Sequence, residues 1–129
     1  MIIDYIGLPH IYGTFDCIIL IKTFYKRELG VSIDLPPYSY SSSWMKDFTT
    51  TSFDERAAKY GTKVPLTDAK NYDLIVFKSK KSNLLIHFGL YLLPSRMLHV
   101  EEGSTSRVDT LSDYWLEHLH GVYRHDSLV

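Results

Sequence analysis

Residues 12–20 have the sequence Tyr-Gly-Thr-Phe-Asp-Cys-Ile-Ile-Leu, in which a glycine-bearing loop leads into an apolar run. Asp16 is of a residue type that commonly caps helix N-termini. Beyond it, apolar residues recur at helical spacing, and lysine and arginine occupy the other side of the expected helix. Gly30 is typical of a helix end. The pattern predicts a helix over residues 16–29, with the only cysteine of the chain, Cys17, in its first turn.

The position of Cys17 permits two interpretations. A thiol at the start of a helix is activated, because the helix dipole and the N–H groups there favour the nucleophilic thiolate. A free cysteine is also commonly a small buried apolar residue without a chemical role. Spacing alone leaves both interpretations open, so the choice depends on whether the chain supplies a base for the thiol.

The composition is that of an ordinary globular protein with a single domain, residues 1–129. Hydrophobic residues make up 45% and charged residues 22%, and the formal net charge is −1. No basic run indicates a nucleic-acid partner, and Lys78, Lys80 and Lys81 are expected in a solvated hairpin turn. A single cysteine excludes an internal disulfide and a cysteine-rich zinc site. No stretch has the layout of a signal peptide or the length of a membrane span, so we expect synthesis in a cytoplasm and no membrane insertion.

The first half of the chain is expected to be helical and the second half β-rich. Residues 1–12 predict a short helix or coil, and residues 31–51 a loop with a turn of helix near Trp44. Ser52 and Glu55 match a capping box. The further expected elements are a helix at 53–60 that ends at Gly61, strands at 72–77, 85–92, 97–101, 106–109 and 122–124, and a helix at 111–119 capped by Thr110 or Ser112. Consecutive short strands predict an antiparallel meander, so helices followed by this sheet make an α+β domain.

Histidines are the candidate bases for Cys17. The chain has six of them: His10, His87, His99, His118, His120 and His125. His87 and His99 lie inside two apolar strands, where an unpartnered imidazole is costly to bury. One such histidine is more often a satisfied core residue. Two of them, on strands that could be hairpin neighbours, favour an active site in which one acts as base and the other orients it.

Other chemistries have weaker signals in this sequence. Cys17, His87 and His99 could bind zinc, with His118 and His120 as further ligands, but the close ligand spacings typical of zinc sites are absent. The Gly-x-Ser-x-Gly turn of serine hydrolases and a phosphate-binding glycine loop are also absent. The sequence therefore predicts no metal and no cofactor.

Four motifs follow one another along the chain. They are Gly13-x-x-Asp16-Cys17, Asp73-Leu-Ile-Val-Phe77, His87-Phe-Gly-Leu-Tyr91 and Leu98-His99-Val100. In this order, with the second histidine 12 residues after the first, they resemble the NlpC/p60 family of cell-wall cysteine peptidases. The stretches 9–13 and 24–30, followed by Leu35-Pro36, resemble its phage tail-tip branch. The likeness runs from Tyr5 to Arg124 and implies a papain-like α+β fold, with N-terminal helices packed on an antiparallel sheet.

The resemblance also implies roles for individual residues. Cys17 matches the nucleophile, His87 the general base, and His99 the polar group that orients the base. Tyr5 matches a family tyrosine whose hydroxyl lies by the active site. Asp16 matches an acid that helps bind the amino end of the peptide. A core position for Tyr5 and a purely capping role for Asp16 are the alternatives.

The implied reaction is hydrolysis of an amide bond in peptidoglycan stem peptides, next to a D-γ-glutamyl residue. The tail-tip branch implies other phage tail-tip proteins as partners and a place at the tip of the virion tail, from which the enzyme acts on the bacterial periplasm and cell wall. Ile18-Ile19 replaces the usual Ser-Gly of the family, which bears on the choice of substrate. A structural tail-tip subunit with little activity, and an acyltransferase or amidase of the same superfamily, are the alternatives.

Overall fold

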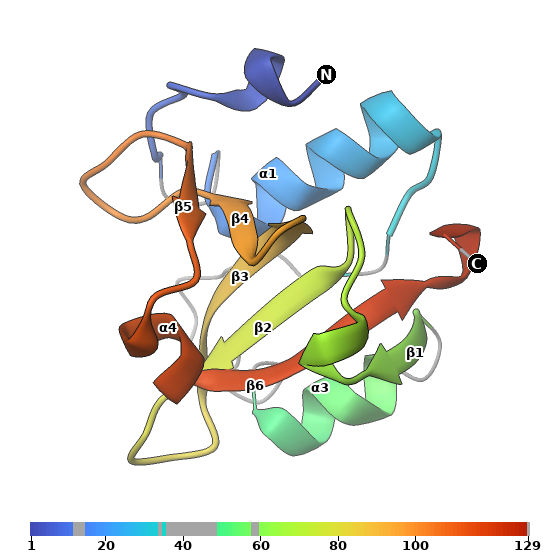
Figure 1. The fold of residues 1–129 in the computed structure, drawn as a ribbon, viewed down its shortest axis with the longest axis vertical. Coiled ribbons are helices and arrows are strands. Elements are labelled where there is room, and N and C mark those ends of the chain that lie inside the picture. The colour runs from blue at the N-terminus through green and yellow to red at the C-terminus, as the bar shows by residue number, and fades with distance from the viewer. Residues whose placement is uncertain (12–14, 34, 36–48, 58–59, 129) are drawn as a thin grey trace.

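The computed structural model of this protein describes residues 1–11, 15–33, 35, 49–57 and 60–128. The helices are α1 (Cys17–Phe24), α3 (Thr50–Ala57) and α4 (Asp113–Glu117), with the short helical turns η1 (Ile2–Tyr5), η2 (Tyr25–Leu29), η3 (Leu66–Asp68) and η4 (Asp126–Leu128). The strands are β1 (Gly61–Val64), β2 (Leu74–Lys78), β3 (Leu85–Leu92), β4 (Arg96–His99), β5 (Arg107–Thr110) and β6 (Leu119–His125). All six strands form one antiparallel sheet (Figure 1), so the predicted α+β class is confirmed. The turn expected near Trp44 lies outside the described residues.

Helix α1 begins where the sequence predicts. The Oδ1 atom of Asp16 accepts hydrogen bonds from the backbone N–H groups of Ile18 and Ile19, each at 3.0 Å. The helix continues into the π-helical turn η2 and ends at Gly30, whose φ of 68° lies in the left-handed region that glycine adopts without strain. The predicted extent of 16–29 is therefore confirmed, with a wider last turn than in a regular α-helix.

Helix α3 begins earlier than predicted, at Thr50. The side-chain oxygen of Thr49 accepts a hydrogen bond from the backbone N–H of Ser52 at 3.1 Å, so Thr49 caps the helix and Ser52 lies within its first turn. The predicted capping box at Ser52 and Glu55 is wrong, because the helix already begins at Thr50 and Thr49 accepts the N–H of Ser52 itself. The end of this region also differs, since Gly61 opens β1 instead of ending a helix.

The sheet is not the simple meander that the sequence predicted. Its strand order is β1-β6-β2-β3-β4-β5, so β2 to β5 form a meander while β6 returns to lie between β1 and β2. Strand β1 was not predicted, because it is a short edge strand without aromatic residues. Its backbone lies so close to β6 that a Cβ on Gly61 would come within 1.9 Å of the carbonyl oxygen of Arg124. Strand β6 is longer than the predicted 122–124, because it pairs on both sides.

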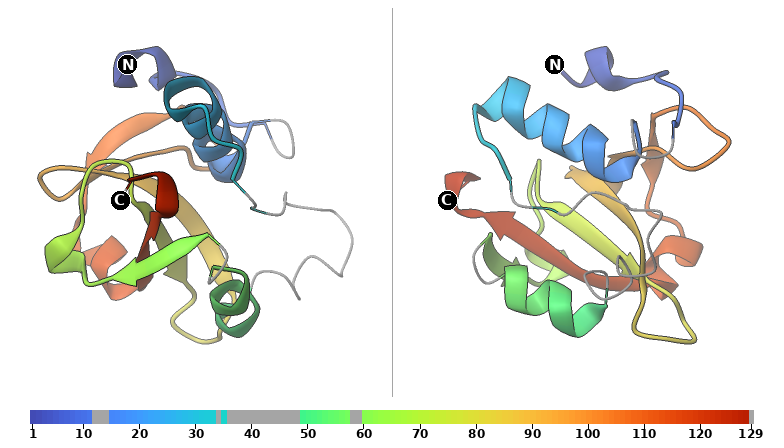
Figure 2. Two further views of the ribbon diagram at one scale, coloured as in Figure 1. Left: turned by 90° about the vertical axis from the view of Figure 1, so that its right-hand side faces the viewer. Right: turned by 180° about the vertical axis from the view of Figure 1, so that it is seen from behind.

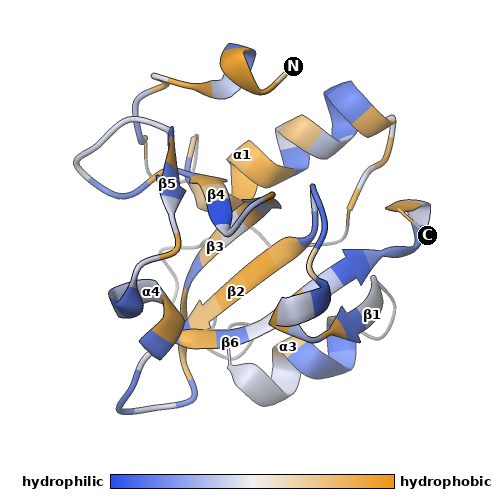
Figure 3. Ribbon diagram, in the orientation of Figure 1, coloured by the Kyte–Doolittle hydropathy of each residue, from blue (hydrophilic) through white to orange (hydrophobic). Residues whose placement is uncertain are grey.

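Alternating residues of β2 divide the core into two parts. Leu74 and Val76 pack in the cluster that contains α1 and α3, whereas Ile75 and Phe77 pack with Trp115 of α4 on the other face. Figure 2 shows α1 and α3 on the same side of the sheet, and Figure 3 shows β2 apolar along most of its length. No helix in the described ranges is long and apolar enough to span a bilayer. The two-layer packing fixes the start of α1 against the sheet.

Candidate active site

A cavity of about 380 Å³ opens at the start of α1. Five segments contribute to its walls: His10, Cys17, the run 84–87 that leads into β3, residues 100–102 after β4, and Tyr114-Trp115 of α4. The cavity therefore brings together the thiol and one predicted histidine from parts of the chain that are distant in sequence. Its walls also carry an acidic pair, Glu101-Glu102, and the aromatic rings of α4.

The capping bonds of Asp16 hold the backbone on which the thiol stands. Cys17 is the first residue of α1 and is 4% exposed. Asp16 accepts the N–H groups of Ile18 and Ile19, so the backbone that carries Cys17 is held in the first turn of the helix. The structure thus combines the two interpretations of Cys17, since the residue is largely buried and still lines a cavity.

The two strand histidines meet, as their spacing predicted. The Nε2 atom of His87 on β3 lies 2.8 Å from the Nδ1 atom of His99 on β4. The ring of His87 stacks on Trp115, with centroids 5.0 Å apart and an interplanar angle of 26°. The ring of His99 meets the same indole edge-on at 5.4 Å. The indole therefore fixes both imidazole planes from one side.

The histidine pair continues into a charged chain that the sequence did not predict. The Nε2 atom of His99 lies 2.7 Å from Oδ2 of Asp109, and Nε of Arg107 lies 2.7 Å from the same oxygen. Arg107 also pairs with Glu101 on the cavity wall. Alternation in β5 does place Arg107 and Asp109 on one face, but only the pairing of β4 with β5 puts them beside His99.

Burial keeps both histidines neutral. Burial beside His99 lowers the pKa of His87 to about 3, with Arg107 and His10 adding smaller effects of the same sign. Burial also lowers the pKa of His99, against the opposing effect of its hydrogen bond to Asp109. A neutral His87 is able to accept a proton from a thiol at physiological pH.

The lowered pKa of His87 predicts acid-sensitive stability. Its ring binds a proton in the unfolded chain below about pH 6.5 but resists it in the folded one, so stability is lost as the pH falls from about 6.5 toward 3. For a shift of this size, the free energy of unfolding should fall by about 2 kcal/mol between pH 7 and pH 5 from this group alone. Urea denaturation at the two pH values measures it.

His87→Gln should reduce the loss of stability between pH 7 and pH 5 by about 2 kcal/mol, whereas the same change at the partly exposed His118 should leave it as in the wild-type protein. The comparison is made within each variant, between its two pH values, so a general loss of stability in His87→Gln does not disturb it. An equal fall from pH 7 to pH 5 in wild type and His87→Gln would contradict the prediction.

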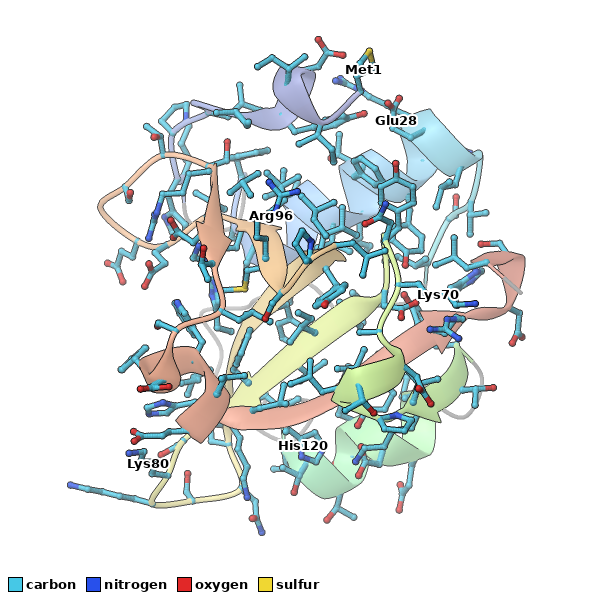
Figure 4. All side chains as sticks on the ribbon, viewed as in Figure 1. Met1, Glu28, Lys70, Lys80, Arg96 and His120 are labelled. Carbon is cyan, nitrogen blue, oxygen red and sulfur yellow. The ribbon has the colours of Figure 1, made fainter. Side chains whose placement is uncertain are left out.

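The structure does not place Tyr5 beside the cavity, contrary to the prediction. Tyr5 is 3% exposed and packs against Phe24, with ring centroids 5.1 Å apart. Burial and the neighbouring Glu28 raise the pKa of its hydroxyl. Glu28 lies next to Met1 at the far end of the helix (Figure 4), about three turns from Cys17.

The path of the N-terminal segment explains the difference. Ser106 donates its hydroxyl to the backbone carbonyl of Tyr5, and the N–H of Gly7 donates to the carbonyl of Ser106 at 2.7 Å. These bonds hold residues 5–7 against the start of β5. The chain then runs toward the thiol, so His10 lines the cavity in place of the expected tyrosine.

Asp16 acts as the predicted helix cap, and its predicted substrate contact stays a prediction. Its Oδ1 atom makes both capping bonds. Its Oδ2 atom is buried and has no hydrogen-bond partner among the described residues. A buried carboxylate oxygen without a donor is costly.

The zinc alternative finds no support in the arrangement of the histidines. His118 bonds to the carbonyl of Tyr114, and His120 pairs with Asp54 of α3 at 3.0 Å, so neither lies with Cys17. Within the described part of the chain, no three histidine, cysteine or acidic side chains are placed to hold a metal ion.

Comparison with known proteins agrees with this geometry. A sequence profile of the NlpC/P60 family matches residues 7–124, nearly the whole chain. The chain belongs to the NlpC/P60 family. A lipoprotein-like NLP/P60 family protein of Staphylococcus aureus is 26% identical, with a TM-score of 0.65, over 95% of this chain and 38% of that one. The present NlpC/P60 chain thus spans well under half of that relative. Comparison with curated protein sequences finds no match.

Two other solved structures bear on what an NlpC/P60 domain can do. The NlpC/p60 domain of the peptidoglycan hydrolase SagA is 20% identical, with a TM-score of 0.64, over 95% of this chain and 91% of that one. RipD of Mycobacterium tuberculosis, described as a non-catalytic NlpC/p60 domain protein adapted to peptidoglycan binding, is 18% identical, with a TM-score of 0.62, over 95% and 89%. Both likenesses establish the shared fold.

Proposed function

We propose that the chain is a cysteine peptidase that hydrolyses an amide bond in peptidoglycan stem peptides, next to a D-γ-glutamyl residue. The observation that carries the proposal is the shared cavity of Cys17 and His87, with His99 bonded behind His87. A nucleophile, a base and a group that orients the base are the three parts that thiol hydrolysis requires. The resemblance to cell-wall peptidases supplies the class of substrate.

The proposed reaction uses only groups of the chain and water. His87 takes the thiol proton of Cys17, and the sulfur attacks the amide carbonyl carbon. The backbone N–H of Cys17, at the positive end of α1, helps to hold the oxyanion. Protonated His87 then gives its proton to the leaving amine, and water releases the acyl group from the sulfur. Burial alone disfavours the positive charge of protonated His87, and the negative charge of the thiolate offsets this cost.

The proposed setting is the tip of a phage tail, where the enzyme would open the cell wall locally during genome entry, next to other tail-tip proteins. The resemblance of stretches 9–13 and 24–30 to that branch supports it. So do the exposed apolar side chains of the N-terminal segment, which suit a protein–protein contact. They are Met1, Ile3, Ile6, Leu8 and Ile11. The chain would be made in the host cytoplasm and act in the periplasm.

A structural subunit with little activity is the second candidate. Ile18 is fully buried and Ile19 partly so, in place of the Ser-Gly that resembling peptidases carry after the cysteine. A serine hydroxyl near the substrate amine is therefore missing here. RipD shows that an NlpC/p60 domain can be non-catalytic.

Digestion of purified Gram-negative peptidoglycan separates the two candidates. Because Cys17 is the only cysteine, iodoacetamide blocks this thiol alone and gives a matched inactive control. We expect stem-peptide fragments cut at D-γ-glutamyl, identified by mass spectrometry, with untreated protein only. Fragments cut elsewhere would change the assigned bond. If neither the free protein nor intact tail particles release fragments, the result would favour the structural subunit.

A further inference from the structure

We propose that Asp109 is a positioning residue that sets where the protons lie on both active-site histidines, and so leaves Nδ1 of His87 as the atom that takes the proton of Cys17. The inference rests on the proposed peptidase function for its kinetic consequence. The proton arrangement itself follows from the hydrogen-bond chain and holds whether or not the protein cleaves peptidoglycan.

The carboxylate of Asp109 is ionised. Burial alone would raise the pKa of Asp109, but the hydrogen bond from His99 and the charge of Arg107 hold it below its usual range. The guanidinium Nε lies 2.7 Å from the same Oδ2 atom that His99 contacts. An ionised carboxylate can only accept hydrogen bonds, so the Nε2 atom of His99 must carry the proton.

The proton position on His99 determines the proton position on His87. His99 is fully buried and its pKa is lowered by burial, so the ring is neutral and holds one proton only. With that proton on Nε2, its Nδ1 atom has a lone pair and must accept the 2.8 Å bond from His87. His87 then carries its own single proton on Nε2. Its Nδ1 atom is left as the basic atom, on a side chain that lines the cavity with Cys17.

The surroundings of the chain prevent exchange between the two proton arrangements. Trp115 covers both rings, and His99 is fully buried, so water does not reach its ring nitrogens to act as an alternative donor or acceptor. Among the described residues, the titratable and charged groups that line the cavity or act on the pKa values of the pair are His10, Cys17, Glu101, Glu102, Arg107, Asp109 and Tyr114. Asp109 is the acceptor at the outer end of the chain, bonded to Nε2 of His99.

Removal of this acceptor should reverse both rings. In Asp109→Ala the shared acceptor of His99 and Arg107 is lost, and the guanidinium of Arg107, which lay 2.7 Å from the same Oδ2 atom, can only donate. His99 would then carry its proton on Nδ1 and His87 would have to accept through Nε2, so its own proton would move to Nδ1 and its lone pair on Nε2 would be taken up by the bond from His99. Asp109→Asn can keep one amide oxygen in the place of Oδ2, so it should preserve the wild-type arrangement.

The test combines ¹⁵N NMR of the imidazole rings with hydrolysis kinetics. We expect both wild-type rings to be neutral and protonated on Nε2, the protons to move to Nδ1 in Asp109→Ala, and kcat of that variant to fall by about 10²–10⁴-fold with KM nearly unchanged. Asp109→Asn should retain both the ring signature and most of kcat. The exposed Asp113 offers a matched control, since Asp113→Ala should change neither readout.

The proposal is overturned by a wild-type His87 protonated on Nδ1, or by Asp109→Ala with unchanged ring signatures. Equal losses of kcat in Asp109→Ala and Asp109→Asn would also overturn it. Both variants lose the negative charge, and only Asp109→Asn keeps an acceptor oxygen, so equal losses would mean that the charge and not the acceptor matters. Failure of the peptidase proposal is a separate outcome. A wild-type protein that cleaves nothing still reports its ring protons, and those spectra decide the proposal without a variant that must fold.

Discussion

Cys17→Ala is expected to abolish hydrolysis of stem peptides, with a loss of roughly 10⁴-fold or more in kcat, because the proposed acyl intermediate is a thioester and Cys17 is the only cysteine of the chain. The substitution removes one sulfur atom from a residue that is 4% exposed, so the free energy of unfolding should change by only about 1 kcal/mol. Fragment release measured by mass spectrometry, with urea denaturation on the same sample, checks both statements.

Cys17→Ser is the matched control for shape. The hydroxyl occupies nearly the volume of the thiol, but it is a weaker nucleophile beside a base whose pKa is lowered to about 3. We therefore expect Cys17→Ser to be nearly as inactive as Cys17→Ala and as well folded as the wild-type protein. Hydrolysis retained in Cys17→Ala would contradict the mechanism, since the reaction would then need another nucleophile.

The parts of the fold that the sequence predicts well are those with local signals. Asp16, a helical run and Gly30 define α1 and η2, and the apolar run 85–92 defines β3 to the residue. Strand β1 has no such signal, because a short polar edge strand is stabilised by its partner β6. The start of α3 was misplaced because two hydroxyl residues, Thr49 and Ser52, could each serve as the cap.

In the candidate site, too, the residues with local sequence signals are the ones that are predicted. The resemblance and the strand pattern bring Cys17, His87 and His99 to one place, which the structure shows as one cavity and one hydrogen bond. The role of Asp109 depends on strand register, which a sequence pattern does not specify for two short strands. The misplacement of Tyr5 has a different origin, since backbone bonds to Ser106 decide the path of the N-terminal segment.

Asp73→Ala is expected to cost the most stability of the substitutions considered, about 3–5 kcal/mol. Asp73 is fully buried just before β2, and its carboxylate accepts from Nε and Nη2 of Arg124 on β6 at 3.1 and 2.9 Å. It also accepts from the backbone N–H of Lys70 at 2.9 Å. Removal of the acid leaves the guanidinium of Arg124, whose side chain is 16% exposed, without its carboxylate partner, and of its described bonds only the one to the backbone carbonyl of Asp68 remains. Denaturation in urea measures the loss, which would be a large share of the stability of a small domain.

Glu117→Ala tests the same kind of pair at the surface. Glu117 and Lys80 lie 2.6 Å apart, closer than the buried pair, but their side chains are 57% and 52% exposed. Lys80 lies at the lower left of Figure 4, beside α4. Water screens this pair and replaces its bonds, so its loss should cost less than about 1 kcal/mol. If burial rather than distance decides the energy of an ion pair here, the loss of free energy of unfolding in Asp73→Ala must be several times the loss in Glu117→Ala. Similar losses in the two variants would show that water solvates Arg124 when its acid is removed.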